Sequence, residues 1–567
     1  MGACASCLCC GAAAQCIPKQ CFAAQTARSN PNFEAVPEDP RFSAEWLSQA
    51  LQQRGKLPAG ASVTSLNIGE IILDMEGEEL KNGGGLAGGQ TVRVKEIEYG
   101  GNLSVEERAR LPSSLIQKHI ESDNVMKEAP SWKFRLAISF VYGSVRDSRN
   151  IMEGGMVREI ETYRSLAAEL PVRTPELYYA ALDGYADGPD WAWVYRPRDS
   201  LCLRGVLLLE DLSTSGYSGC GHAVLDYKDG GLSGAVQEEA FRCMARIHGW
   251  GWGGRGMEPE SGLEGLVMGK IWILGWAIIK PFAKDDKQLT QFLDIYSDNA
   301  DWPLLQDPDV LAMLFDLRAN TMNWVQRALD KDQRQTVLHG DFHRGNMFAK
   351  TKEDGTVELA LFDFSFIGAG NCTWELLYFQ VLGGGRLDAA EEARLLEVYH
   401  EALMVAKPDC GYSLQQLKID YKLQLFTVIA SQLNDMHKID KTGEYEHVYE
   451  EHAVKPNIDG VGQKSTAQFL QHSIRRLVEY HKDQSSWDDY FSGAQPTAAY
   501  AERTPEEIAV AKAALQAAVE KNVAKRREGK AKADQEEEEK AQRAGGGKGG
   551  AGAGGAGMGE SLLTNTP

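Results

Sequence analysis

Polar residues of the kind that transfer phosphate are concentrated in residues 337–363. A His-Gly-Asp motif ends at Asp341, Asn346 follows five positions later, and a second apolar run ends at Asp363. Phosphoryl transfer from ATP uses an aspartate that accepts the proton of the attacking hydroxyl, and an asparagine and a second aspartate that bind Mg²⁺. A Glu-Asp-Gly-Thr turn signal at 353–356 predicts a hairpin between the two apolar runs. We therefore expect both aspartates to share one cleft.

These motifs resemble the aminoglycoside/choline phosphotransferase family of small-molecule kinases, which has His-Gly-Asp-x-x-x-x-Asn, a hairpin, and an apolar run ending in Asp-Phe. Eukaryotic protein kinases have His-Arg-Asp and Asp-Phe-Gly at these places, where this chain has His-Gly-Asp and Asp-Phe-Ser. The resemblance implies that Asp341 is the catalytic base and that Asn346 and Asp363 bind Mg²⁺. His339 and His343 join the catalytic set as residues that shape the loop.

Two other interpretations of this stretch are open. His339, Asp341 and His343 alternate as residues on one strand face do, and such a set can hold a metal ion. That interpretation leaves Asn346 and Asp363 without a role. In the second interpretation the polar residues only cap the ends of strands, with no chemistry.

A glycine-rich stretch upstream is a candidate phosphate-covering loop. It contains Gly83, Gly85 and Gly88 and precedes residues 91–99, whose polar and apolar side chains alternate as in a half-exposed strand. Because the stretch enters a strand and not a helix, it does not fit a dinucleotide-binding turn but fits a loop over ATP phosphates. On local grounds a flexible surface loop is equally compatible.

Lys118 and a following helix supply a candidate phosphate clamp. Residues 111–118 resemble the family segment Pro-x-Ser-Leu-Ile-x-Lys, whose lysine holds the ATP phosphates, and place Lys118 at the end of a short strand. Apolar residues at helical spacing predict one helix over 157–170. Glu159 matches the family pattern Glu-x-x-x-Tyr, which implies an ion pair with Lys118; Glu161 is the rival candidate.

Two further segments carry the resemblance towards one branch of the family, and one residue departs from the family pattern. A buried-strand signal over 206–212 ends in Leu-Glu-Asp-Leu, which resembles the ecdysteroid-kinase-like, or CHK-kinase-like, branch. This implies that Glu210 lies in the hinge that binds nucleotide, through backbone groups. The helix that ends near His248 resembles the same branch, and we interpret this histidine as a packing or capping residue. Glu375 stands where the family has an aspartate of structural role.

The resemblance implies an α+β, bilobal protein-kinase-like fold, with a small antiparallel-sheet N-lobe and a larger, mainly helical C-lobe. We expect a Cys-rich targeting segment over 1–33, the N-lobe over 34–210, the C-lobe with the catalytic loop over 211–500, and a tail over 501–567. The tail begins as a solvated helix from Pro505 to about Ala533. It then becomes glycine-rich, and such a composition buries no core.

Composition agrees with a folded enzyme and excludes some partners. The chain has 567 residues, 43% hydrophobic and 25% charged, which suffices for two packed lobes. Its net charge of −20 argues against a nucleic-acid partner. The longest apolar run, residues 266–279, is too short to span a membrane and predicts a buried helix.

The N-terminus predicts lipid attachment. Residues 1–33 hold six of the 11 cysteines and no acidic residue. Gly2 and the following residues fit the N-myristoylation pattern, with Cys4 and Cys7 as palmitoylation sites, as well as Cys9 and Cys10. A myristoyl chain alone binds membranes marginally, so acylated cysteines would be the second anchor. We expect a cytoplasmic, membrane-associated protein; an organelle transit peptide or a disordered terminus are the alternatives.

We therefore expect Mg²⁺-dependent transfer of the ATP γ-phosphate to a hydroxyl of a small molecule. The alternative is a membrane-tethered pseudokinase that binds nucleotide or a partner without turnover. A protein kinase is disfavoured because the chain has no Ala-Pro-Glu segment, and an esterase because residues 216–220 lack the last glycine of the nucleophile elbow. Choline-like amines, sugars, aminoglycosides and sterols fit the motifs equally as acceptors.

Overall fold

The computed structural model describes residues 42–71, 89–121, 154–183, 204–220, 232–253, 268–269, 335–380, 389–422 and 424, and scattered residues between 506 and 535. Backbone contacts divide the chain into two units, Met1–Asp285 with Asn320–Glu502, and Asp286–Ala319 with Arg503–Pro567. The elements from α2 to α14 belong to the first unit. In the second unit the described residues are helical and exposed, within the segment expected to form a solvated helix.

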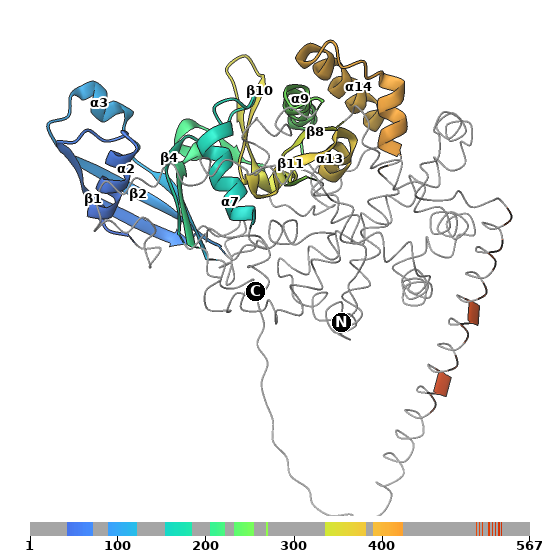
Figure 1. Ribbon diagram of the computed structural model, residues 1–567, viewed down its shortest axis with the longest axis horizontal. Coiled ribbons are helices and arrows are strands. Elements are labelled where there is room, and N and C mark those ends of the chain that lie inside the picture. The colour runs from blue at the N-terminus through green and yellow to red at the C-terminus, as the bar shows by residue number, and fades with distance from the viewer. Residues whose placement is uncertain are drawn as a thin grey trace, which may run out of the picture. The chain divides into compact units, whose positions relative to one another are not determined.

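An antiparallel sheet forms the N-terminal part of the first unit. Its five strands lie in the order β1-β2-β3-β5-β4 (Figure 1). They are β1 (Ala61–Ile71), β2 (Gly89–Gly101), β3 (Leu115–Glu121), β5 (Arg204–Glu210) and β4 (Leu177–Asp183). The strand expected over 91–99 is β2, extended at both ends. β3 continues past Lys118, so this lysine lies inside the strand and not at its end, because β2 and β5 pair with β3 on both sides.

Helix α2 (Ala44–Gln53) covers the face of the sheet opposite Lys118. The side chain of Ser43 caps its first turn by accepting a hydrogen bond from the Trp46 N–H at 3.1 Å, a type of contact that stabilises a helix by about 1 kcal/mol. Leu47 packs fully buried against Leu115 of β3 and other apolar residues of the sheet. Each such leucine contributes about 1.5–3 kcal/mol by leaving water. Side chains alternate along β3, so Lys118 points to the other face.

The helix expected over 157–170 changes type part-way. It begins as α7 (Gly154–Glu161) and continues as a π-helix, η1 (Thr162–Leu166), with the Ala167 N–H bonded to the Thr162 carbonyl at 2.8 Å. The prediction of one continuous α-helix is therefore wrong beyond Glu161. The wider turn accompanies a contact of the Tyr163 ring with Phe364, 5.7 Å between centroids, and π-turns often occur at functional sites.

Helices α9 (Gly234–Trp250), α13 (Cys372–Phe379) and α14 (Ala389–Ala406) dominate the later part of the unit. Two small sheets accompany them, ordered β10-β9-β6 and β7-β11-β8. Their strands are β6 (Ser218–Gly219), β7 (Met268–Gly269), β8 (Gln335–Leu338), β9 (Met347–Thr351), β10 (Val357–Leu361) and β11 (Gly368–Asn371). An antiparallel sheet that precedes a mainly helical part confirms the predicted α+β, kinase-like fold.

The hairpin predicted between the two apolar runs is confirmed. β9 and β10 pair in antiparallel fashion, with Thr351 opposite Val357. Gly355 supplies the positive φ of the turn, +81°, and the Thr356 N–H donates to Asp354 Oδ1 at 2.9 Å. The hairpin brings the start of β9 and the end of β10 side by side, which places the two predicted catalytic segments together.

The helix predicted over 266–279 is wrong at the two residues that the structure describes there. Met268 and Gly269 form β7, which runs parallel to Gly368 and Ala369 of β11. Pairing with a neighbouring strand satisfies their backbone groups, and a single-sequence pattern does not distinguish a short buried strand from a buried helix. Among the described helices, none combines the length and the apolar character that crossing a membrane requires.

Several predicted residues lie outside the part of the chain that the structure describes. They are Gly83, Gly85 and Gly88 of the expected phosphate loop, and Gly2, Cys4, Cys7, Cys9 and Cys10 of the expected lipidation segment. The boundaries between targeting segment, lobes and tail also stay predictions.

Candidate active site

The loop between β8 and β9 carries the His-Gly-Asp motif, and His339 anchors it. His339 is buried; its Nδ1 accepts a hydrogen bond from the Asp341 N–H at 3.3 Å, so its Nε2 donates to the Phe362 carbonyl at 3.0 Å. Burial lowers the pKa of His339, which favours this neutral, doubly bonded ring. Both ring nitrogens contact the backbone, so His339 holds the loop in place and neither nitrogen is available to a metal ion.

The backbone conformation and close packing at residue 340 explain why the motif contains glycine and not arginine. Its φ is +84°, and a Cβ at this position would lie 1.9 Å from the carbonyl oxygen of Phe366. Its N–H donates to Oε1 of Glu375 at 2.6 Å. A side chain at residue 340 would therefore separate the catalytic loop from the segment that follows Asp363.

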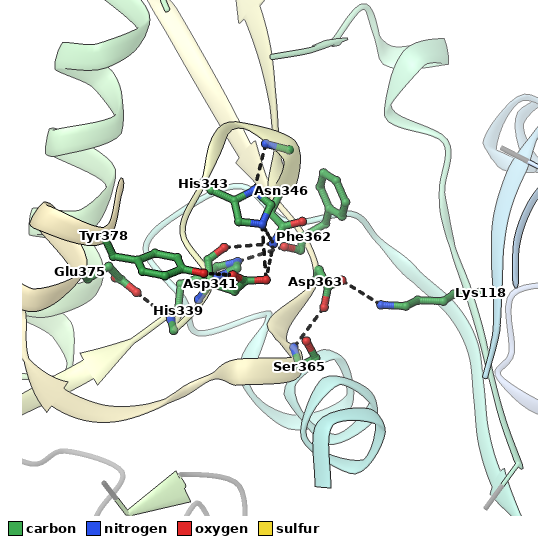
Figure 2. A network of polar contacts seen from close by, with 12 residues as sticks. Lys118, His339, Asp341, His343, Asn346, Phe362, Asp363, Ser365, Glu375 and Tyr378 are labelled. Atoms are coloured by element: carbon green, nitrogen blue, oxygen red, sulfur yellow. Dashed lines mark hydrogen bonds and ion pairs between the residues drawn. The ribbon is translucent and has the colours of Figure 1, made fainter. Parts of the chain in front are cut away.

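Asp341 lies at the centre of the polar network (Figure 2). Its Oδ1 accepts from the Tyr378 hydroxyl at 2.7 Å, and its Oδ2 accepts from Asn346 Nδ2 at 3.1 Å and lies 3.4 Å from His343 Nε2. Burial alone would raise the pKa of Asp341, but the contacts from His343 and Tyr378 hold it below its ordinary value. The carboxylate is therefore ionised and oriented, yet its side chain keeps 21% exposure, which leaves access to solvent.

Asn346 and His343 both contact Asp341, and Asn346 Nδ2 lies 3.1 Å from His343 Nε2. Asn346 Nδ2 also donates to the backbone carbonyl of Asp341 at 3.0 Å, an orientation that leaves Oδ1 as the amide atom suited to a cation. His343 Nδ1 accepts from the Gly345 N–H at 3.1 Å, so its proton resides on Nε2 and faces Asp341. The Phe362 N–H donates to the Asn346 carbonyl at 3.2 Å, which holds the end of β10 against this loop.

Asp363 follows β10 in a left-handed conformation, with φ +60°. Aspartate is among the few side chains that tolerate this region. Its Oδ1 accepts from the Ser365 N–H at 3.3 Å and its Oδ2 from Lys118 Nζ at 3.1 Å (Figure 2). Burial raises the pKa of Asp363, but the ammonium of Lys118 outweighs this and lowers the pKa to about 2. This carboxylate is therefore a permanent anion.

Lys118 binds a second carboxylate, Glu159 of α7, with 2.7 Å between Nζ and Oε2. The rival candidate Glu161 contacts Arg164 at 2.8 Å, so the structure pairs the lysine with Glu159. Burial alone would lower the pKa of Lys118, but Asp363 and Glu159 raise it, and the amine stays protonated. The residue before Glu159, Arg158, donates from Nε to the Ser365 carbonyl at 2.7 Å. Helix α7 therefore holds both the lysine and the segment after Asp363.

The charges and donor atoms of this cluster fit a divalent cation. One ammonium contacts two carboxylates. Burial, with the negative charge of Asp363, raises the pKa of Glu159 to about 7, although Lys118 lowers it. Mg²⁺ prefers oxygen ligands and usually takes one or two from the protein, with waters and substrate phosphates filling the rest. Asp363 and Asn346 supply such oxygens. In the described ranges no group of three or more His, Cys, Asp or Glu side chains forms a closed metal site.

Glu375, where the family pattern has aspartate, has the structural role expected of it. It is fully buried in α13 and accepts from Gly340 with one oxygen, while its Oε2 lies 2.9 Å from His248 Nε2. His248 Nδ1 lies 2.8 Å from the hydroxyl of Tyr399 in α14. His248 is thus a buried, hydrogen-bonded residue that supports the catalytic loop through Glu375.

Glu210 lies at the end of β5, as expected for the hinge. Its carboxylate contacts Arg173 and accepts from the Ser215 hydroxyl at 2.8 Å and the Glu176 N–H at 3.1 Å. These contacts hold the end of β5 against its neighbours and occupy the side chain of Glu210. The assignment of Glu210 to nucleotide binding stays a prediction that rests on backbone atoms.

Tyr378 was not predicted from the sequence as a site residue. This tyrosine lies one helical turn after Glu375 in the apolar run 376–379, so its side chain reads as core. The spacing of three from Glu375 is the signal that was available, since residues three apart lie on one helix face.

Residues 152–408, less than half of the chain, match the model of the phosphotransferase enzyme family. Over these residues the chain is similar to that family. The matched residues contain α7, β5, the loop between β8 and β9, and Tyr378, whereas Lys118 lies before them. No curated protein sequence matches the chain.

Solved kinase structures are similar to the chain only distantly. A microcompartment-associated aminopropanol kinase is 11% identical over 78% of this chain and 98% of its own, with a TM-score of 0.35. A choline kinase from Cryptosporidium parvum Iowa II is 10% identical over 74% and 90%, with a TM-score of 0.34. An ADP-bound aminoglycoside phosphotransferase is 12% identical over 73% and 95%, with a TM-score of 0.30. Likeness at this level carries no argument about the acceptor.

Proposed function

We propose that the protein transfers the γ-phosphoryl group of ATP, with Mg²⁺, to a hydroxyl of a small molecule. The observation that carries this proposal is the contact of Lys118 with Asp363, two residues 245 positions apart whose side chains meet at 3.1 Å. It joins the sheet of the N-terminal part to the end of the catalytic hairpin. Phosphoryl transfer in kinases uses a strand lysine paired with a helical glutamate, together with an aspartate that holds Mg²⁺.

Lys118 and Glu159 form the phosphate clamp in this proposal. The protonated amine of Lys118 binds phosphate oxygens, and Glu159 keeps it in place from α7 at 2.7 Å. Asp363 and Asn346 hold Mg²⁺ through carboxylate and amide oxygens. When bound, Mg²⁺ would neutralise the negative charge that develops on the phosphates during the reaction.

Asp341 acts on the acceptor. It is ionised, oriented by donors on both oxygens, and open to solvent on one side. Its carboxylate accepts a hydrogen bond from the acceptor hydroxyl, aligns the hydroxyl oxygen with the γ-phosphorus, and takes the proton as the new bond forms. The family match at residues 152–408 supports a phosphotransferase. The following experiment identifies the chemical class of the acceptor.

The decisive experiment is transfer from γ-labelled ATP. Purified protein is incubated with Mg²⁺, labelled ATP and a cellular metabolite pool, and then with a panel of single hydroxyl compounds that includes 1-aminopropan-2-ol, choline, ethanolamine, aminoglycosides, sugars and sterols. We expect one labelled small product that requires Mg²⁺ and forms at least about 10²-fold more slowly with Asp341→Asn. Asp354→Asn is the matched control, because Asp354 lies at the exposed tip of the same hairpin.

A pseudokinase is the competing proposal, and the same experiment separates the two. Binding of Mg²⁺–ATP by calorimetry, together with no transfer to any compound and no phosphate release, favours a nucleotide-binding protein without turnover. Absence of both binding and transfer contradicts both proposals.

We also propose that the protein is held at membranes from the cytoplasmic side by acylation of its N-terminus. The pattern at Gly2 and the adjacent cysteines Cys4 and Cys7 supports this proposal. An organelle transit peptide is the alternative, and it predicts removal of the first residues.

A further inference from the structure

The hydrogen bonds of Asp341 define which lone-pair positions of its carboxylate are left for an acceptor hydroxyl. A carboxylate has about four lone-pair positions, two on each oxygen. Among the described residues, Asn346 Nδ2 and His343 Nε2 approach Oδ2, and the Tyr378 hydroxyl alone approaches Oδ1. One acceptor position therefore remains on Oδ1, and it lies beside the Tyr378 hydroxyl.

The Tyr378 hydroxyl is held as a permanent donor. Burial, followed by the charge of Asp341, raises the pKa of Tyr378 well above its ordinary value, so the phenol stays protonated. Its ring packs on Trp374 one turn earlier in α13, with 4.6 Å between centroids and 32° between planes. Trp374 is itself buried. The tyrosine thus points at Asp341 from a rigid helix (Figure 2).

We propose that Tyr378 is a positioning residue that directs the acceptor hydroxyl onto Oδ1 of Asp341 and borders the acceptor site. This inference rests on the proposed phosphotransferase function and adds to it the residue that aligns the acceptor. By bonding to Oδ1, Tyr378 fixes the rotation of the carboxylate, so the remaining position on Oδ1 has a defined direction.

The reaction balances with Tyr378 unchanged. The acceptor O–H bond breaks and its proton passes to Oδ1 of Asp341, while the acceptor oxygen bonds to the γ-phosphorus. The bond between that phosphorus and the β–γ bridging oxygen breaks, and ADP leaves with the electron pair. Tyr378 keeps its proton throughout and donates to the same oxygen before and after the transfer.

The test is Tyr378→Phe, which removes the hydroxyl and keeps the ring on Trp374. Transfer to the acceptor found in the labelled-ATP screen is compared in wild type, Tyr378→Phe and the control Tyr412→Phe. Tyr412 donates to Asp420 at the same distance, 2.7 Å, in a buried site away from the catalytic loop. The control therefore removes an equivalent tyrosine–aspartate bond without touching Asp341.

We expect kcat/KM for the acceptor to fall about 10- to 100-fold in Tyr378→Phe, the range for a hydrogen bond to a charged group. The KM for Mg²⁺–ATP should stay within about twofold, and Tyr412→Phe should transfer as wild type does. The share of ATP turnover that ends in hydrolysis should rise in Tyr378→Phe, since water needs less alignment than a larger acceptor. A purely structural role predicts equal losses for ATP and acceptor.

A double-mutant cycle guards against an effect that bypasses Asp341. In an Asp341→Asn background, Tyr378→Phe should lower the residual transfer by much less than in the wild-type background. Wild-type transfer kinetics in Tyr378→Phe, or an equal loss in both backgrounds, would overturn the inference while leaving the proposed function intact. If wild type transfers to no acceptor, the proposed function fails, and the inference fails with it.

Discussion

The carboxylate of Glu375 accepts a hydrogen bond from the backbone of Gly340, with 2.6 Å between Oε1 and the amide nitrogen. The other carboxylate oxygen lies 2.9 Å from Nε2 of His248, and His248 contacts Tyr399 at 2.8 Å. All three side chains are buried. Helices α9, α13 and α14 therefore hold the loop between β8 and β9 through the carboxylate of Glu375. The position of Asp341 thus depends on contacts that Asp341 itself does not make.

Glu375→Ala should lower the free energy of unfolding by about 3–5 kcal/mol, because it leaves buried partners of a carboxylate unsatisfied. Glu375→Gln should cost less, since the amide oxygen still accepts from Gly340. Denaturant titration measures both. The control is Glu397→Ala in α14, an exposed carboxylate 2.9 Å from Lys418, with an expected loss of about 0–1 kcal/mol. Equal losses for Glu375→Ala and Glu397→Ala would contradict the structural role.

Gly340→Ala should abolish turnover and destabilise the loop. Its Cβ would lie 1.9 Å from the Phe366 carbonyl oxygen, so either Asp341 or the segment after Asp363 must move. Gly355→Ala is the matched control, because Gly355 has nearly the same φ, +81° against +84°, but open space around it. The control should lose only about 1–2 kcal/mol of stability, the cost of the backbone strain that alanine adds at this φ. Activity in Gly340→Ala comparable with that of the control would show that the loop adapts.

The site was predictable where one residue type at one spacing suits one chemistry. Asp341 and Asp363 are 22 positions apart, and the turn at 353–356 sufficed to place them together, since hairpin pairing is local. The choice between Glu159 and Glu161 was different. Two residues on one helix point about 200° apart, so the partner of Lys118 depended on which face met the sheet.

The parts that escaped prediction depend on tertiary contacts. The change from α7 to the π-helix at Thr162 has no local signal; it goes with the packing of Tyr163 on Phe364, about 200 positions later in the chain. Met268 and Gly269 became a strand because β11 offered an edge. In the sequence, Tyr378 looks like one more apolar residue of a helix. The structure distinguishes it, because its hydroxyl lies 2.7 Å from Asp341 Oδ1.

Lys118→Met should weaken binding of Mg²⁺–ATP at least about tenfold, because the amine that contacts the phosphates is lost. Isothermal titration calorimetry provides the measurement. The melting temperature should also fall, since the buried carboxylate of Glu159 and the half-buried carboxylate of Asp363 lose their cation. Lys95→Met is the control, because Lys95 is exposed on the neighbouring strand β2. Unchanged affinity in Lys118→Met together with a loss in Lys95→Met would transfer the assignment to Lys95.

Gly2→Ala should shift the protein from the membrane fraction to the soluble fraction, because only glycine at this position accepts the myristoyl amide. Replacing Cys4, Cys7, Cys9 and Cys10 with serine should weaken retention while Gly2 is intact, since one myristoyl chain binds marginally. Cell fractionation and mass spectrometry of the N-terminus provide the readouts, with serine replacements at Cys243 and Cys410 in the body as the control. Retention that does not depend on Gly2, or removal of the first ~30 residues, would favour a transit peptide.

Asp341→Asn and Asp363→Asn should separate chemistry from nucleotide binding. Asp341→Asn should cut turnover by roughly 10²–10⁴-fold, the range that a general base contributes, while Mg²⁺–ATP affinity stays close to wild type. Asp363→Asn should lower both, because it removes the charge that contacts Lys118 and the proposed metal ligand, although asparagine tolerates the left-handed backbone at φ +60°. A general folding defect would instead lower both quantities in both variants. Transfer by Asp341→Asn at the wild-type rate, on the acceptor that the screen identifies, would refute the assignment of the base.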